Sequence, residues 1–373
     1  MKPLTSLHFS DIHLGCPRLN PDLMVDNLIR FLFPLIQKEK PQLIGIQGDL
    51  FDTSLSYADK WSPPLIKFLS GLLFLCQEQN IKLRVLRGTF SHDRIQPSII
   101  PVLHQEMKFT FDLGYYDTID VEYIQDYDLK VGYIPDNTPY SSSEEVIDQL
   151  LLKMKERGWD SIDYLFMHGS FSHTLPLAAQ KHCKVLFRED QFSFVKGFVI
   201  TGHIHKHAIV KNIINNGSIN RLTFGENEPK GCILIRDDGN QASLQFIENK
   251  EACQFKVYDL SHISLEEIGS LDEIKKELSL IPSTVECHVK IIHGIVNVGI
   301  QIVSHLREQF PHIRFVRERG ILNEPIVIEE EPAEEEEVIT PESLPKIISE
   351  TVKSEEKTLS EERVSDLLNM VER

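Results

Sequence analysis

The first 250 residues alternate short apolar stretches of β-strand length with longer stretches of helical periodicity. The strand-like segments LTSLHFS and PQLIGIQ precede DLMVDNLIRFLFPLIQKEK and PPLIKFLSGLLFLCQEQN, whose length and apolar spacing predict helices. This alternation favours a layered α/β architecture. A β-hairpin is expected at GCILIRDDGNQASLQFIE, because DDGN favours a tight turn.

The character of the sequence changes near residue 250, which divides the chain into a large domain, 1–250, and smaller parts. Residues 251–325 predict a small separate α/β module, and the glutamate-rich residues 326–340 predict an extended acidic linker. Residues 341–373 predict two short amphipathic helices. They either dock back on the body or bind a partner, and we favour a partner because short isolated helices are marginal in water.

Composition and charge restrict the class of protein. Apolar residues make up 41% and charged residues 25%, which is typical of a globular chain, and no apolar run is long enough to cross a bilayer. We therefore expect a soluble cytoplasmic protein with no membrane partner. Residues 325–373 hold 15 acidic and 5 basic residues, and so contribute −10 to the net charge of −17. The acidity is concentrated there, so net charge argues only weakly against binding of nucleic acid.

The six cysteines are dispersed and form no CxxC pair. This pattern predicts reduced, mostly buried thiols rather than a disulfide framework or a thiolate zinc site.

Polar side chains with metal-binding capacity follow five of the predicted strands. Because ligand sites in open α/β sheets lie beyond the carboxyl ends of the strands, we expect these side chains to meet. They are Asp11 and His13, Asp49, Ser91 and His92, His168, and His203 and His205.

Such a cluster predicts a dinuclear metal centre. Asp49 is the candidate to bridge two divalent ions, which together would bind a phosphate group and activate water. Mixed imidazole and carboxylate ligands suit manganese, iron or zinc. His92 is the candidate catalytic residue, because it follows the third strand beside a ligand and could steady the transition state or protonate the leaving oxygen.

The remaining histidines lack companions at strand ends. His173 is ambiguous, and we expect it not to bind metal. The others are interpreted as surface or core-edge residues: His8, His104, His182, His207, His262, His288, His293, His305 and His312.

The order of these motifs resembles the calcineurin-like metallophosphoesterase superfamily. FSDIHLG, GDLFD, HGSF, TGHIHKH and especially NNGSINRLTFGENEPKG are similar to the SbcD-type DNA repair nucleases, over roughly residues 1–250. The resemblance implies a metallophosphoesterase β-sandwich flanked by helices, with 251–325 as a capping domain and 341–373 as an ATPase-binding helical tail. It also implies two divalent ions, usually manganese, exonuclease and single-strand endonuclease activity on DNA, a homodimer, and an SbcC-type coiled-coil ABC ATPase as partner.

The resemblance also implies roles for the individual residues. Asp11, His13, Asp49 and His205 would surround one metal, and Asp49, Ser91, His168 and His203 the other, with His92 as the catalytic histidine. The chain departs from the family at RGTFSHD, where the family has G-N-H-D or G-N-H-E, so Ser91 is taken to replace the ligand asparagine. A serine is a poorer ligand. Ser91 keeps a catalytically weak scaffold subunit open as an alternative, and a phosphoesterase acting on other phosphodiesters is a further alternative.

Overall fold

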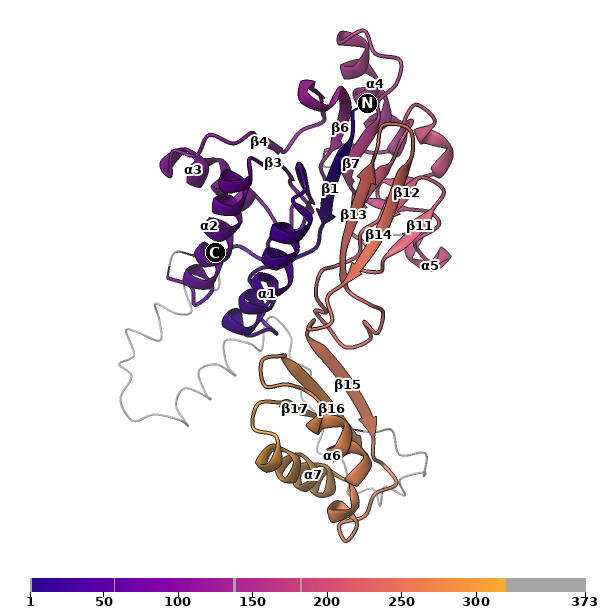
Figure 1. Ribbon diagram of the computed structural model, residues 1–373. Helices are drawn as coiled ribbons and strands as arrows, with labels where there is room; N and C mark the ends of the chain where they lie inside the picture. Colours follow the sequence, from indigo (N-terminus) through magenta and orange to yellow (C-terminus); the bar gives the residue numbers. More distant parts are fainter. Residues whose placement is uncertain (1, 57, 137–138, 182, 320–373) are drawn as a thin grey trace, which may run out of the picture. The chain divides into compact units, whose positions relative to one another are not determined.

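The computed structural model describes residues 2–56, 58–136, 139–181 and 183–319, and two six-stranded sheets form its centre (Figure 1). The first sheet has parallel pairing through β1–β4, with an antiparallel hairpin beside β1. Its strands, in spatial order, are β14 (Ala242–Glu248), β13 (Gly231–Asp237), β1 (Leu4–Phe9), β2 (Leu43–Gln47), β3 (Lys82–Leu86) and β4 (Leu113–Tyr116). The hairpin predicted at residues 231–248 is therefore confirmed.

The second sheet has four parallel strands with an antiparallel strand at each edge. Its strands, in spatial order, are β11 (Ala208–Val210), β12 (Ile213–Asn215), β10 (Val199–Gly202), β7 (Tyr164–His168), β6 (Leu129–Ile134) and β5 (Asp120–Ile124). Two short strands, β8 (Ser170–Phe171) and β9 (Leu186–Phe187), pair separately.

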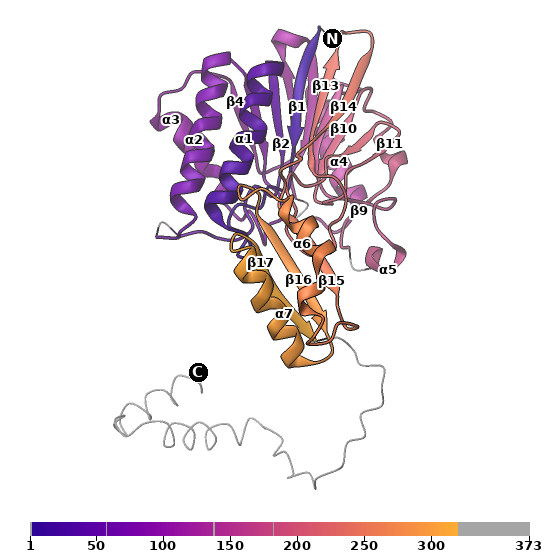
Figure 2. The same ribbon diagram turned by 60° about the horizontal axis from the view of Figure 1, so that its bottom comes forward.

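Helices cover the outer faces of both sheets, which gives four layers (Figure 2). The helices are α1 (Pro21–Glu39), α2 (Ser62–Gln79) and α3 (Ile99–Glu106) beside the first sheet, and α4 (Ser143–Glu156) beside the second, with the short α5 (Leu177–Gln180) nearby. Strand β7 shows why the layers form. Leu165 and Met167 pack with α4, while Tyr164 and Phe166 on the opposite face pack between the sheets. The predicted layered sandwich flanked by helices is confirmed.

A third sheet of three parallel strands begins at Gln254. It consists of β15 (Gln254–Asp259), β16 (Cys287–His293) and β17 (Arg314–Arg319), with helices α6 (Asp272–Ser279) and α7 (Val296–Gln309). These elements enclose an apolar core of their own, although Cys253 and Phe255 belong to the core of the first sheet. The structure keeps this module in one unit with the two large sheets, so the predicted boundary at residue 250 stays a prediction.

The predicted acidic linker, 326–340, and helical tail, 341–373, lie outside the described residues. Within the described residues, no helix combines the length and apolar character needed to cross a lipid bilayer.

A buried ion pair joins the two central sheets. Arg84 on β3 is about 1% exposed, and its guanidinium donates two hydrogen bonds to the carboxylate of Glu122 on β5. These bonds join Nε to Oε2 at 2.8 Å and Nη2 to Oε1 at 2.6 Å. Tyr116 and Tyr133 donate to the same carboxylate, at 2.8 and 2.6 Å. The pKa of Glu122 is lowered: burial would raise it, but the bonds from Arg84 outweigh burial.

Replacing Arg84 by Met should destabilise the protein by about 3–5 kcal/mol, because Glu122 would keep its burial and lose its cation. The midpoint of urea unfolding measures the loss. Arg236→Met is the matched control, because Arg236 pairs with Glu39 but is itself 44% exposed, and its loss should cost less than about 1 kcal/mol. Equal losses in the two variants would contradict the prediction.

Burial of His8 should make the fold sensitive to acid. His8 lies on β1, fully buried against Phe166, and burial lowers its pKa to about 3. Between pH 6.5 and 3 the unfolded chain binds a proton that the folded chain excludes, so stability present above pH 6.5 is lost as the pH falls. The expected slope is up to about 1.4 kcal/mol per pH unit. Unfolding of His8→Gln between about pH 7 and 5 should be less pH-dependent than that of the wild type, and identical slopes would contradict the assignment.

Candidate metal centre

The carboxyl ends of β1, β2, β3, β7 and β10 meet at one edge of the sandwich, where the predicted residues lie. Several of these residues adopt left-handed backbone conformations: φ is 52° at Asp11, 54° at His13, 49° at Asp49 and 99° at His203. Such conformations are costly for residues other than glycine and persist where the surroundings fix them. Here the backbone N–H of Asp11 donates to Gly48 O at 3.1 Å and that of His13 to Asp49 O at 3.0 Å, which ties the two strand ends together.

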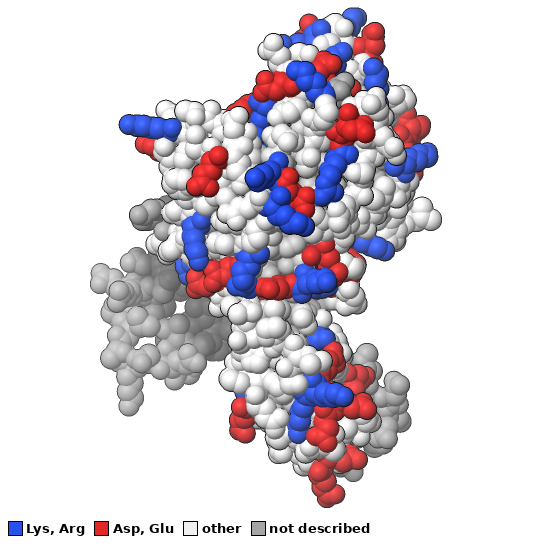
Figure 3. All heavy atoms as spheres, in the orientation of Figure 1, with Lys and Arg blue, Asp and Glu red and all other residues white. Residues whose placement is uncertain are grey.

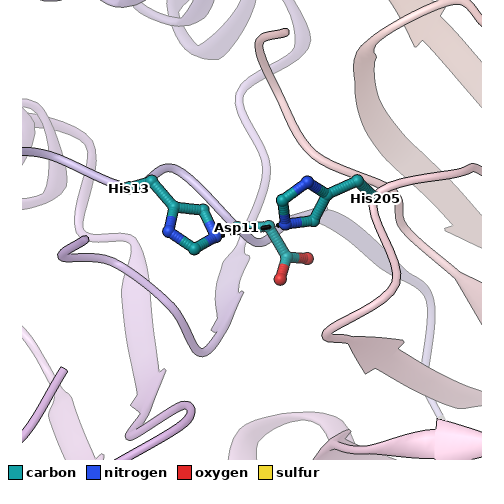
Figure 4. A group of neighbouring side chains, drawn as sticks. All are labelled: Asp11, His13 and His205. Atoms are coloured by element: carbon teal, nitrogen blue, oxygen red, sulfur yellow. Dashed lines mark hydrogen bonds between the residues drawn. The ribbon is translucent and has the colours of Figure 1, made fainter. Parts of the chain in front are cut away.

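The first group consists of Asp11, His13 and His205, whose ligand atoms lie within 4.8 Å of one another. Figure 4 shows the two imidazoles pointing toward each other beside the carboxylate, with the two Nε2 atoms 3.2 Å apart. The Asp11 carboxylate accepts hydrogen bonds from Ser10 Oγ at 2.5 Å and from the backbone N–H of His203 at 2.9 and 3.1 Å. The group is thus positioned before any ligand binds.

Two further carboxylates orient these imidazoles. The Nδ1 atom of His13 lies 3.0 Å from Asp52 Oδ1, and Nδ1 of His205 lies 3.1 Å from Glu226 Oε1. Because each carboxylate accepts from Nδ1, both Nε2 atoms are left as ligands, which is the usual outer arrangement around histidine-bound metals. Glu226 is itself held by the buried Lys230, whose Nζ lies 2.8 Å from Oε2.

The second group consists of Asp49, His168 and His203. Nε2 of His168 lies 3.3 Å from Asp49 Oδ2, and its Nδ1 donates to the carbonyl of Gln47 at 2.8 Å. The same Oδ2 lies 3.8 Å from Nε2 of His13 in the first group. Asp49 therefore stands between the two groups.

Thr89, rather than Ser91, joins the second group. Its Oγ1 lies 3.3 Å from Asp49 Oδ2, 3.2 Å from His168 Nε2 and 3.3 Å from His203 Nδ1. Ser91 is exposed and does not line the cavity beside the two groups. The chain supplies a hydroxyl directly after Gly88 and then loops out at Phe90 and Ser91, so that Thr89 lies where the sequence predicted Ser91. Ser91 as a metal ligand stays a prediction.

His92 lies at the mouth of the site. Its Nδ1 donates to the backbone carbonyl of Asp52 at 2.8 Å, its ring packs edge-on against His13 at 4.9 Å between centroids, and its side chain is 38% exposed. This bond turns Nε2 away from the protein backbone and leaves it available to a substrate. Asp93, next in sequence, accepts from the backbone N–H groups of Phe51 and Gly88.

The electrostatics of the second group suit a cation. Burial alone would raise the pKa of Asp49, but the charges of His168 and His13 hold it well below its usual range. For His168, burial would lower the pKa, but Asp49 raises it to about 10. Burial lowers the pKa of His203. Asp49 is thus anionic, and a divalent ion could replace the proton of His168.

A cavity of about 380 Å³ opens onto both groups. Most of the residues that line it have polar side chains, and they include ligand candidates from both groups: His13, Cys16, Pro17, Arg18, Asp49, Asp52, Thr89, His92, His203, His205, Leu222, Thr223 and Glu226.

The donor set fits transition-metal ions. Four imidazoles and two carboxylates converge, and the Nε2 atoms of His13 and His205 face each other. The imidazoles of His13, His168 and His205 are each held by a hydrogen bond at Nδ1, which leaves Nε2 free to bind a metal. These buried clusters could hold metal ions, with mixed ligands typical of manganese, iron or zinc.

Sequence reasoning missed Thr89, Asp52 and Glu226. Each stands in a motif already singled out, RGTFSHD, GDLFD and TFGENEPKG, but nothing in those strings separates an orienting carboxylate from a surface one. Among the described residues, His173 and the histidines interpreted as outside the site belong to neither of these two groups, and His182 lies outside the described residues.

Comparisons with known proteins give the fold only weak parallels. No protein-family model matches the chain, and no curated protein matches it. Among solved structures, the chain is similar to GAP50, the anchor in the inner membrane complex of Plasmodium, at 13% identity over 67% of this chain and 86% of that one, with a TM-score of 0.37. It is also similar to the protein TT1561 of Thermus thermophilus, at 10% identity over 66% and 99%, with a TM-score of 0.37. Similarity at this level assigns no activity, which must be argued from the site.

Replacing Thr89 by Val should weaken manganese binding about tenfold, because the isosteric side chain removes an oxygen beside Asp49, His168 and His203. Calorimetric titration of metal-free protein with Mn²⁺ measures the change. Ser91→Ala is the matched control and should bind as the wild type does. Weakening by Ser91→Ala without any effect of Thr89→Val would restore Ser91 as the ligand.

Proposed function

We propose that the protein is a metal-dependent phosphodiesterase that cleaves DNA, with two divalent ions, manganese for preference, held by the two groups. The observation that carries the proposal is the position of Asp49 between them, with Oδ2 3.3 Å from His168 and 3.8 Å from His13. A carboxylate shared by two ligand sets is the arrangement expected of two-metal phosphoryl-transfer sites.

Asp11, His13, Asp49 and His205 would hold one ion, and Asp49, Thr89, His168 and His203 the other. When bound, such ions neutralise phosphate charge and make a water more nucleophilic. The protein's own residues do the rest. Asp52 and Glu226 keep the Nε2 atoms of His13 and His205 directed at the site, and His92, anchored through Nδ1, presents Nε2 to the scissile phosphate and to the departing oxygen.

DNA as the substrate class rests on the sequence resemblance and on one feature of the site. Arg18 lines the cavity, where its guanidinium could pair with a backbone phosphate. On the face drawn in Figure 3, basic and acidic side chains lie interspersed among the described residues, without a continuous basic stripe. Contacts with DNA would therefore be concentrated at the site rather than spread over that face.

We extend the proposal to the assembly that the resemblance implies. The protein would act as a homodimer with an SbcC-type coiled-coil ABC ATPase in DNA end processing, and residues 341–373 would bind that ATPase. A cytoplasmic location follows from this role.

A single experiment separates this function from its alternatives. Protein with Mn²⁺ is given labelled duplex and single-stranded DNA and, separately, a chromogenic phosphodiester. We expect degradation of DNA that falls at least about 100-fold in His92→Ala, the usual scale for loss of an acid–base group. His305→Ala, on α7 and outside the metal groups, is the control and should keep full activity.

Turnover of the chromogenic ester without DNA cleavage would favour a phosphoesterase with another substrate. Absence of both activities, with the ATPase added, would favour a scaffold and contradict the proposal.

A further inference from the structure

A second kind of metal-ligand cluster lies apart from the candidate active site. Cys253, Glu286 and His288 bring a thiol sulfur, a carboxylate oxygen and an imidazole nitrogen within 4.8 Å of one another. Cys253 is 2% and His288 4% exposed, and the side chain of Glu286 is 12% exposed. The three donors differ chemically, and none of them belongs to the two groups beside Asp49.

Strand pairing brings these residues together. β15 and β16 run parallel with Gln254 opposite Cys287 and Phe255 opposite His288, and the backbone N–H of Gln254 donates to Glu286 O at 2.9 Å. The pairing thereby places Cys253 opposite Glu286. Glu286 and His288 are two residues apart in an extended segment, so they share a face, while Cys287 points to the other side and packs in the core of the three-stranded module.

Neighbouring groups hold the imidazole of His288 and the carboxylate of Glu286 in place, whereas the thiol of Cys253 has no strong hydrogen-bond partner among the described residues. The His288 ring stacks on Phe255 with centroids 4.8 Å apart, and its Nε2 lies 2.9 Å from Glu286 Oε1. The backbone N–H of Asn20 donates to both carboxylate oxygens, at 2.8 and 3.0 Å. The Cys253 sulfur, by contrast, has one long polar contact, 4.0 Å to Gln254 O. A buried thiol with so weak a partner can turn to a ligand without losing a strong bond.

We propose that Cys253, Glu286 and His288 bind a zinc ion at the start of strands β15 and β16. Tetrahedral zinc sites have bonds of about 2.3 Å to sulfur and about 2.0 Å to nitrogen and oxygen, so their ligand atoms lie roughly 3–4 Å apart. The observed cluster needs only small side-chain shifts to reach that spacing. On binding, the sulfur–hydrogen bond breaks, a sulfur–zinc bond forms and the proton leaves to solvent. Water completes the fourth position.

The choice of metal follows from the thiolate. A soft sulfur ligand favours zinc over manganese, whereas the carboxylates and imidazoles beside Asp49 accept manganese. The two sites should therefore be filled by different ions in the same protein.

Cobalt can report this site separately from the active site, because only a thiolate ligand gives cobalt an intense near-ultraviolet charge-transfer band. Full-length protein is stripped of metal, saturated with Mn²⁺, and then titrated with Co²⁺. We expect the titration to produce the band in the wild type and in Cys287→Ala. Cys253→Ala and His288→Ala should lack it, and elemental analysis after exposure to zinc should find one ion fewer in Cys253→Ala than in Cys287→Ala.

Absence of the band in the wild type, or its persistence in Cys253→Ala, would overturn the proposal. Glu286→Gln provides a second test that keeps an acceptor for Asn20, so it guards against a folding defect. It should weaken cobalt binding about tenfold or more, and unchanged affinity would also count against the site. None of these outcomes depends on whether the protein cleaves DNA.

Discussion

The hydrogen bond from His168 Nδ1 to the carbonyl of Gln47 joins the ends of β7 and β2, and so holds the two central sheets together at the edge where the site forms. The chain at Gly48 approaches the imidazole of His168 so closely that no side chain fits at position 48. Gly48 has φ of 81°, and a Cβ atom there would lie 2.4 Å from His168 Nδ1. The position of Asp49 between two ligand groups is a consequence of this contact, because Asp49 follows Gly48 directly. The chemistry of the site thus depends on how two sheets meet.

The parts of this arrangement that follow local rules could be predicted from the sequence. Helices α1 and α2 begin and end within a residue or two of the predicted segments, since apolar periodicity and length determine them. Because ligand sites lie beyond the carboxyl ends of parallel strands, the sequence also predicts that Asp11, Asp49, His168 and His203 meet at one edge of the sheets. No rule of that kind covers a loop. Asp93 accepts hydrogen bonds from the backbone N–H groups of Gly88 and Phe51, which fix the conformation of this loop. In that conformation Thr89 and His92 face the site and Ser91 faces away.

The cluster of Cys253, Glu286 and His288 shows a different limit of sequence reasoning. The sequence gives no sign of a zinc site at His288, because a cysteine 33 and 35 residues before its partners matches no familiar spacing of zinc ligands. Parallel pairing of β15 with β16 removes that separation. Such pairing is set by long-range packing of the three-stranded module, which no short window of sequence contains.

The bonds from Asn20 to Glu286 connect the small module to the loop that leads from the candidate metal centre to α1. Asn20 caps α1, and only six residues separate it from His13, whose backbone conformation is already strained. Arg314 on β17 also donates to the carbonyl of Arg18 in the same short loop, at 3.3 Å. The small module is therefore bonded at two points to the short loop that follows His13, so the position of that loop is tied to the position of the module.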